Sequence, residues 1–459
     1  MIGPLACPDF TLRELLSKRP VEEGGFPHIH SDVLHHGSIT RTARASSLRL
    51  KTVHAEIGPI SGRNWRPSVK LVQGRTCYTN AMTPAFSAYL NGLRFFAAFI
   101  VLVGHGAYRM LDVPALAWIY SHDIARDAVI VFFVLSGLVI AYSAERKADL
   151  GVSRYAADRL GRLWSVAIPA LVLTVLVDIA FEAFGLADVP RGPDDPALWS
   201  VFGAMGLTFT NQLWWLNLDI ATNTPWWSLG YEAWYYAIFA AVFFLRGGTR
   251  LFWTSALILC AGPKLWLLAP AWVVGVIVWR AISRRQHLQL NPRVALWGAG
   301  TTLAVYLLMQ GIDGPNWIKA QTELSLGSEL YDRLARSGPF VWLNLLGLLT
   351  GAHILCVARL CAADESADGR IRRAVHWVAD GTYSLYLVHM PIMWAVDAVL
   401  PADTPALWRG AALLLIPLGA SFLFAEIFER RDWGLRARLR AMADMRRGPR
   451  SVNVSPSVA

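Results

Sequence analysis

Apolar runs of membrane-spanning length alternate with short charged segments along most of this sequence. A bilayer core of about 30 Å requires roughly 20 apolar residues in a helix, and ten runs approach that length. The pattern therefore predicts an all-α fold, a polytopic bundle of about ten transmembrane helices. The predicted spans are 87–110, 127–144, 164–185, 226–245, 251–266, 267–282, 294–311, 338–360, 381–400 and 405–427. The fifth and sixth are the least certain in extent, because Pro263, Lys264 and Pro270 crowd the turn between them.

Charge in the connecting segments alternates with their order along the chain. Lys and Arg gather after the second, fourth, sixth and eighth spans and at the C-terminus, whereas the third and ninth loops are acidic and the seventh is mixed. Because basic loops stay on the cytoplasmic side, this alternation predicts that both termini are cytoplasmic. It also predicts a multi-pass protein of the inner (plasma) membrane.

The segments on either side of the spans differ from the membrane domain. Residues 1–80 are polar and basic, lack sustained periodicity and lack the apolar core of a signal peptide. We expect them to be a disordered tail and interpret their histidine pairs as solvated rather than metal-binding. The sequence thus divides into this tail, a transmembrane domain over 81–432 and a basic cytoplasmic tail over 433–459.

Composition excludes several other classes. Apolar residues make up 54% of the chain and charged residues only 17%, below the quarter or so that is typical of soluble domains. The net charge of +10 fits basic loops beside anionic membrane lipid, so we predict no nucleic-acid partner. The five cysteines are odd in number and lack metal-like pairing, which argues against a disulfide scaffold and predicts no metal site.

Ionisable residues inside the spans are the first candidates for function, since charge at membrane depth is expensive. Arg94 and His105 lie eleven residues apart in the first span. Eleven residues are about three helical turns, so both side chains share one face, about 16 Å apart along the axis. Alternatively, Arg94 is an anchor that snorkels to the membrane surface, and His105 is a packing residue that forms a hydrogen bond. Because the two side chains share one helical face, it is less favoured that both have only these structural roles.

Further candidates lie in the next three helical segments. Ser136-Gly137 is a small pair in the second span that would let another helix approach, and packing is as good an explanation of Ser136 as chemistry. Arg159 and Arg162 share a face and suit phosphate binding, although an ordinary positive-inside loop is an equal alternative. Glu232 lies near the depth expected for His105, where its carboxylate would orient the imidazole.

The ninth span carries Tyr386 and His389, three residues apart and on one face. They are predicted to line a channel in the inner half of the membrane. Helix packing explains the tyrosine equally well.

Four motifs in this order resemble the membrane-bound acyltransferase-3 family, whose members O-acetylate bacterial polysaccharides, lipopolysaccharide and some secondary metabolites. Tyr89 to His105 resembles "YLDGLRG…H", Phe132 to Gly137 resembles "FFVLSG", Trp227 to Glu232 resembles "WSLSVE", and Tyr383 to His389 resembles "SYSLYLWH". The resemblance covers roughly residues 87 to 432. The chain departs from the family at Asn91, Phe95 and Ala233, and Asn91 removes an acidic group that the family usually has there.

The resemblance implies an O-acyltransferase that moves an acyl group from cytoplasmic acyl-CoA, usually acetyl-CoA, to a hydroxyl of a surface or exported glycan or glycolipid. The donor is a substrate, and no bound cofactor is expected. His105, Arg94 and Glu232 are the predicted catalytic residues; the predicted donor-binding residues are Arg159, Arg162, Ser136, Tyr386 and His389. His105 acts either as a general base or as a covalent acyl carrier. A transporter of a polar substrate, an acyltransferase for a secondary metabolite, and a sensor with a vestigial channel are the competing hypotheses.

Overall fold

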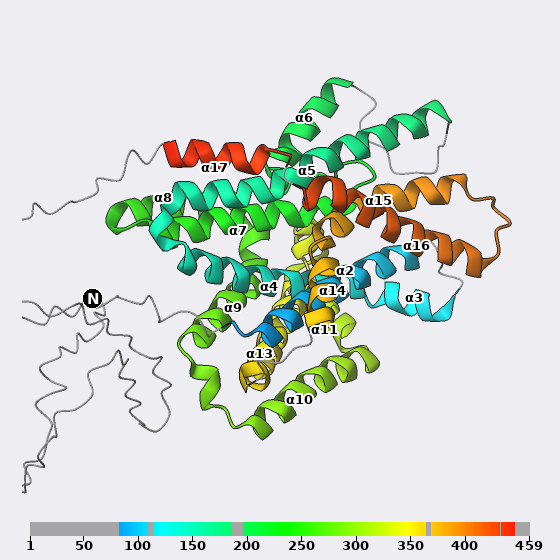
Figure 1. Ribbon diagram of the computed structural model, residues 1–459. Helices are drawn as coiled ribbons and strands as arrows, with labels where there is room; N and C mark the ends of the chain where they lie inside the picture. Colours follow the sequence, from blue (N-terminus) through cyan, green and yellow to red (C-terminus); the bar gives the residue numbers. More distant parts are fainter. Residues whose placement is uncertain are drawn as a thin grey trace, which may run out of the picture. The chain divides into compact units, whose positions relative to one another are not determined.

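The structure, a computed structural model, describes residues 82–108, 110, 113–185, 196–363, 369–431 and 433–445. Throughout these ranges the fold is helical, and no strand is present in them (Figure 1). The all-α prediction is therefore confirmed. The predicted disordered tail over residues 1–80 lies outside the described residues.

Each predicted span corresponds to a helix, and shorter helices fill the connections. The long helices are α2 (Pro84–Ala107), α4 (Ile124–Arg146), α5 (Gly151–Ala183), α7 (Trp227–Phe244), α8 (Gly247–Ala261), α9 (Pro263–Ser283), α10 (Pro292–Gly311), α13 (Phe340–Leu360), α15 (Thr382–Val399) and α16 (Ala406–Phe424). The connecting helices are α3 (Pro114–Ser121), α6 (Pro196–Leu207), α11 (Gly314–Leu326), α12 (Ser328–Arg333), α14 (Gly369–Ala379) and α17 (Leu435–Met445).

Seven segments are long and apolar enough to cross a membrane, namely Pro84–Ala107, Ile124–Arg146, Ala148–Ala183, Pro263–Ser283, Pro292–Gly311, Phe340–Leu360 and Ala406–Glu429. The predicted spans at α7, α8 and α15 are not among them. With 15 residues, α8 is shorter than a bilayer core requires. Helices α7 and α15 have 18 residues each and carry many tyrosine, tryptophan and histidine side chains that are buried in the bundle. Ten spans therefore remain a prediction, as does the orientation of the termini.

Helix α4 forms the centre of the packing, with contacts to α2, α7, α9 and α13. Its crossing with α9 depends on two glycines. A Cβ atom on Gly137 would lie 2.1 Å from the carbonyl oxygen of Trp272, and one on Gly275 would lie 1.9 Å from that of Val134. The predicted close approach at Ser136-Gly137 is confirmed, because any side chain at these glycines would push the two helices apart.

Two predicted boundaries are wrong for identifiable reasons. The turn between the fifth and sixth spans lies at Gly262 rather than at 266/267. Gly262 has a φ of 81° and packs against the Trp214 backbone, which only glycine permits, and Pro263 begins α9. The helix of the third predicted span begins at Gly151 rather than at 164, so Arg159 and Arg162 lie on α5 and share a helical face as predicted.

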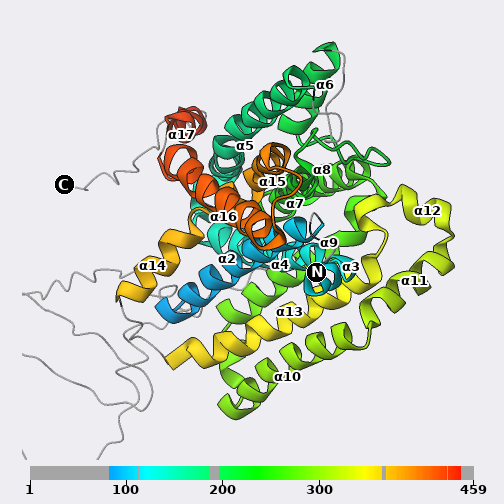
Figure 2. The same cartoon turned by 90° about the vertical axis from the view of Figure 1, so that its right-hand side faces the viewer.

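The C-terminal segment returns to the bundle. A π-helical turn, Ala425–Glu429, ends the α16 segment, and α17 then packs along α5 (Figure 1). Residues 435–445 of the predicted tail are thus a packed helix. On another flank, α10 and α11 lie alongside α13 (Figure 2).

Candidate active site

Two cavities follow one another along α4 and meet at Val129 and Tyr386, which line both. The first has a volume of about 360 Å³ and extends to the end of α4 that carries Lys147. The second has a volume of about 640 Å³ and surrounds the beginning of α4 at Asp123. Of the predicted site residues, the first cavity brings together Arg94, Ser136, Arg159, Arg162, Glu232 and Tyr386. His105 faces the second cavity.

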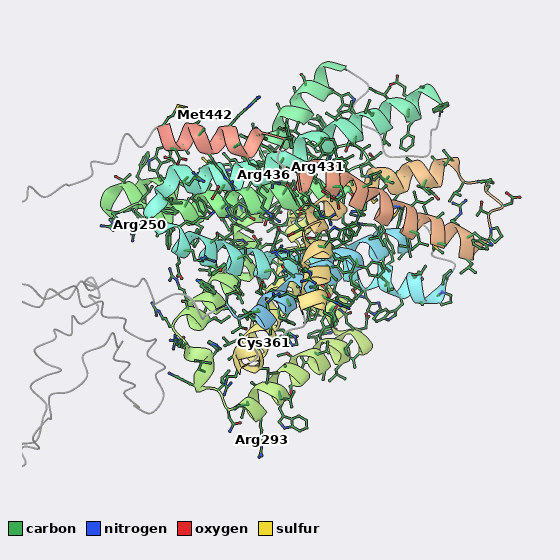
Figure 3. All side chains as sticks on the ribbon, in the orientation of Figure 1. Arg250, Arg293, Cys361, Arg431, Arg436 and Met442 are labelled. Atoms are coloured by element: carbon green, nitrogen blue, oxygen red, sulfur yellow. The ribbon has the colours of Figure 1, made fainter. Side chains whose placement is uncertain are left out.

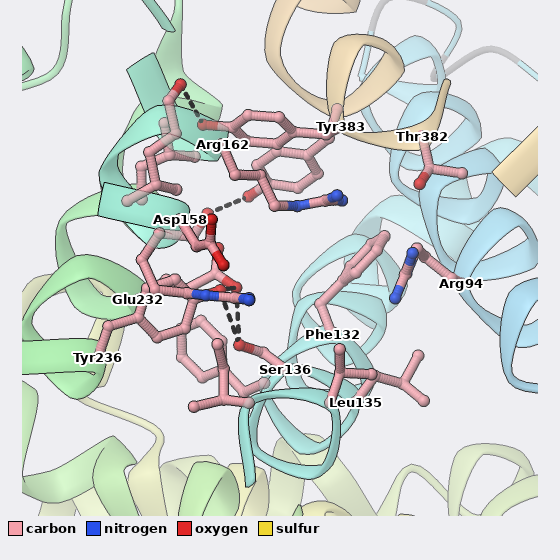
Figure 4. Close-up of a pocket in the computed structure, with 18 of the residues that line it drawn as sticks. Arg94, Phe132, Leu135, Ser136, Asp158, Arg162, Glu232, Tyr236, Thr382 and Tyr383 are labelled. Carbon is pink, nitrogen blue, oxygen red and sulfur yellow. Dashed lines mark hydrogen bonds between the residues drawn. The ribbon is translucent and has the colours of Figure 1, made fainter. Parts of the chain in front are cut away.

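Three arginines dominate the first cavity. Arg94 on α2 and Arg162 on α5 extend into it from opposite sides (Figure 4), and Arg159 lies one turn before Arg162. None of their guanidinium groups forms a hydrogen bond or ion pair with another described residue, although Arg159 lies over the Tyr155 ring at 5.8 Å. A cluster of guanidinium groups that are not engaged in ion pairs with the protein suits an anionic ligand, because guanidinium groups bind phosphates through paired hydrogen bonds.

Two further cations reach this cavity from α17, which the sequence analysis missed. Arg436 lies at the start of α17 (Figure 3), and its Nη2 donates to the Ser165 hydroxyl at 2.7 Å. Arg440 donates from Nε to Asp158 Oδ1 at 2.8 Å, while Lys147 Nζ pairs with the other oxygen at 2.7 Å. The four-residue spacing of Arg436 and Arg440 places them on one helical face. That spacing was the available signal, but it appeared within a segment interpreted as a tail.

Ser136 and Glu232 belong to one hydrogen-bonded group. The Ser136 hydroxyl donates to Glu232 Oε1 at 2.7 Å, the Tyr236 hydroxyl donates to the same oxygen, and Trp272 Nε1 donates to Ser136 Oγ at 3.2 Å. Ser136 is thus held as a carboxylate partner (Figure 4).

The structure does not bring Glu232 to His105, contrary to the predicted pairing. Glu232 lines the first cavity and His105 the second. The prediction used depth along the helices alone. Trp226 and Trp227, which precede Glu232, are only 0% and 6% exposed, so this part of the chain packs inside the bundle.

The partner of His105 is His389. His105 Nδ1 lies 2.9 Å from His389 Nε2, and the rings stack with their centroids 5.1 Å apart. His389 Nδ1 lies 2.8 Å from the carbonyl oxygen of Leu385, which can only accept. In neutral rings, His389 Nδ1 therefore carries its proton, His389 Nε2 accepts from His105 Nδ1, and His105 Nε2 keeps a free lone pair.

This arrangement revises the predicted place of His389. It is 1% exposed and lines neither cavity, so it supports His105 rather than lining a donor channel. Tyr386, one turn earlier on α15, lies between the cavities. Its hydroxyl hydrogen-bonds the Ser228 hydroxyl at 2.7 Å and donates to the carbonyl oxygen of Pro225 at 3.2 Å, which fixes the ring.

The second cavity combines aromatic and basic side chains. Tyr108, Tyr120, Trp227 and Trp394 line it, together with Arg126 and Arg336. Arg336 Nη2 pairs with Asp219 Oδ2 at 3.2 Å. Burial raises the pKa of the Asp219 carboxyl, and Arg336 opposes that rise. No group of three or more metal-ligating side chains forms within the described ranges.

Comparison with known proteins gives two matches. A family model described as an acyltransferase domain, that of the acyltransferase-3 family, matches residues 87–426. The peptidoglycan O-acetyltransferase OatA of Listeria monocytogenes serovar 1/2a is 21% identical over 379 residues, which are 77% of this chain and 55% of OatA. The chain therefore spans about half the length of this curated relative. No solved structure matches significantly.

Proposed function

Because the chain belongs to the acyltransferase-3 family, we propose that it is a multi-pass O-acyltransferase of the inner membrane. In this proposal it moves an acyl group, usually acetyl, from cytoplasmic acyl-CoA to a hydroxyl of a surface or exported glycan. The observation that carries the proposal is the pairing of two cavities. One contains Arg94, Arg159 and Arg162, whose guanidinium groups form no hydrogen bond or ion pair with another described residue, and the other contains His105 with a free lone pair.

The donor would enter the first cavity from the basic end of α4. Positive-inside charge supports a cytoplasmic position for that end, which carries Arg146 and Lys147. Its volume of about 360 Å³ is at the lower end of the range for ligand pockets, so it suits the acyl arm of the donor. The phosphates would then stay with Arg159, Arg162 and the α17 arginines, while Arg94 holds the arm deeper in the cavity.

The acceptor hydroxyl would approach from the second cavity. His105 Nε2 would take the proton of that hydroxyl as its oxygen attacks the thioester carbonyl carbon. The carbon–sulfur bond breaks, the acyl group becomes an ester of the acceptor, and the coenzyme thiolate leaves and takes up a proton. The transfer would occur beside Tyr386, where the two cavities meet. General-base action of this kind contributes about 10² to 10⁴ in rate.

The test uses the full chain in proteoliposomes with acetyl-CoA labelled in the acetyl group. Release of the coenzyme thiol and appearance of label in added envelope glycan are expected, and both should fall in His105→Gln. Entry of intact labelled acetyl-CoA into the vesicles without thiol release would instead support a transporter. Thiol release and transfer that do not differ between wild type and His105→Gln would contradict the assigned site.

A further inference from the structure

Two arginines enter the second cavity from different elements, and the proposed mechanism uses neither. Arg126 lies in the first turn of α4, and Arg336 lies in a 3₁₀ turn, Ala335–Ser337, just before α13. Both line the same cavity as His105. Since charged side chains are expensive in a membrane protein interior, two cations beside the predicted base require an explanation.

Each arginine is held by one carboxylate that leaves most of the guanidinium group available. Arg126 pairs through Nε with Asp123 at 2.9 Å, and Arg336 pairs through Nη2 with Asp219 at 3.2 Å. Their other N–H groups form no hydrogen bond with any residue that the structure describes. The side chains are 24% and 31% exposed, so they are partly desolvated yet open to the cavity.

The backbone around both arginines is also specifically shaped. Asp123 and Ala335 have φ angles of 56° and 50°, in the left-handed region that residues other than glycine seldom adopt. Ser337 is fully buried, hydrogen-bonds the Tyr231 hydroxyl at 2.9 Å and donates to the Lys264 carbonyl at 2.8 Å. These contacts fix the turn that presents Arg336, and strained backbone of this kind is typical of binding sites.

The remaining walls suit a sugar. Aromatic side chains from α2, α3, α7 and α15 surround the cavity, at Tyr108, Tyr120, Trp227 and Trp394. Aromatic faces pack against the apolar surfaces of a ligand and leave its polar groups to fixed partners. A neutral sugar would need only hydrogen bonds, whereas two guanidinium groups with free N–H donors match a carboxylate or phosphate.

We propose that the acceptor carries an anionic group in addition to the hydroxyl that is acylated, and that Arg126 and Arg336 bind this group. The acceptor is therefore an acidic sugar, with a carboxylate or a phosphate as the anion. This inference rests on the proposed function for its assignment of the second cavity to the acceptor. The donor phosphates do not compete, because they belong to the first cavity.

The test measures binding by tryptophan fluorescence, since Trp227 and Trp394 line the cavity. The full chain in nanodiscs is titrated with D-glucuronate, D-glucose 6-phosphate and neutral D-glucose. At least one acidic probe should bind about tenfold more tightly than glucose or better, as expected for a charge-assisted hydrogen bond. The tighter of the two acids identifies carboxylate or phosphate as the anion. Equal binding of all three probes would overturn the inference.

Variants locate the effect. Arg336→Gln should weaken binding of the acidic probe about tenfold and leave glucose unchanged. Arg126→Gln carries the same prediction from another element, so the inference stays testable if one variant fails to fold. The matched control is Arg333→Gln, three residues before Arg336, whose side chain is 62% exposed and pairs with Glu329 outside the cavity. Acid preference that persists in both arginine variants would overturn the inference.

The thiol-release assay separates this inference from the proposed function. If the arginine variants lose the preference for acidic probes but the wild type transfers no acyl group, the proposed acyltransferase activity is rejected and the anion site is retained. If the protein transfers the acyl group to a neutral glycan and Arg336→Gln leaves the acceptor KM unchanged, the anion site is rejected and the proposed acyltransferase activity is retained.

Discussion

The histidine pair gives the sharpest prediction, because under the proposed function one hydrogen bond determines which nitrogen of His105 would act as the base. His389→Leu removes the acceptor 2.9 Å from His105 Nδ1. The imidazole then loses both its orientation and the partner that keeps the proton on Nδ1. The whole contribution of a general base is about 10² to 10⁴ in rate, so this range bounds the loss for His105→Gln and for His389→Leu alike.

His389→Gln tests whether His389 acts by orienting the His105 ring through a hydrogen bond or only by filling space. The glutamine carbonyl oxygen can still accept from His105 Nδ1, so turnover should stay within about tenfold of wild type and well above that of His389→Leu. The assay is acyl transfer in membranes at matched protein levels, with donor binding measured in parallel. Donor affinity should not change in either variant, because His389 lines neither cavity. Equal activity of His389→Leu and wild type would refute the assigned role of His389.

Three further predictions address the donor cavity, the packing and the topology. Replacing Arg159 and Arg162 by alanine should raise the donor KM at least tenfold with little loss of stability, measured by thiol release and thermal denaturation. Gly275→Ala should destabilise the α4–α9 crossing by roughly 1–3 kcal/mol. In thermal denaturation its control Gly300→Ala should cost nothing, because a Cβ there meets no atom within 4 Å. Reporter fusions at Asp194 and Asp403 should lie outside and those at Arg285 and Arg372 inside; an inside signal at Asp194 would contradict the predicted orientation.

The sequence predicted the helices well because hydrophobic length and charged loops determine them locally. It failed where the limits depend on tertiary contacts. The turn at Gly262 exists because the Trp214 backbone packs against it, and α17 forms a face against α5 in a segment whose charges resemble those of a tail. Neither contact produces a hydrophobic periodicity in the sequence that is long enough to distinguish the segment from a loop.

The candidate site was predicted in composition but not in arrangement. Spacing along one helix placed Arg94 and His105 on one face, and the structure sets one beside the first cavity and the other beside the second. Depth alone could not show which neighbour each helix face contacts. The sequence therefore predicted Glu232 as the partner of His105, whereas the partner in the structure is His389. Arg126 and Arg336 meet only in the fold, because they lie on separate elements more than 200 residues apart.

Under the proposed function, the separation of the two cavities explains why a single helix would carry both an arginine for the donor and a histidine for the acceptor. Eleven residues of α2 span about 16 Å, so Arg94 and His105 can each serve one cavity while their relative position stays fixed by the helix. Tyr386 lies between them with its hydroxyl bound to Ser228 and Pro225. Under the proposed function, the reacting groups would meet beside this side chain, while the rest of the coenzyme and the rest of the glycan would occupy different cavities. Under the proposed function, this arrangement would let an acyl group cross the membrane while its charged carrier stays on the side where it was made.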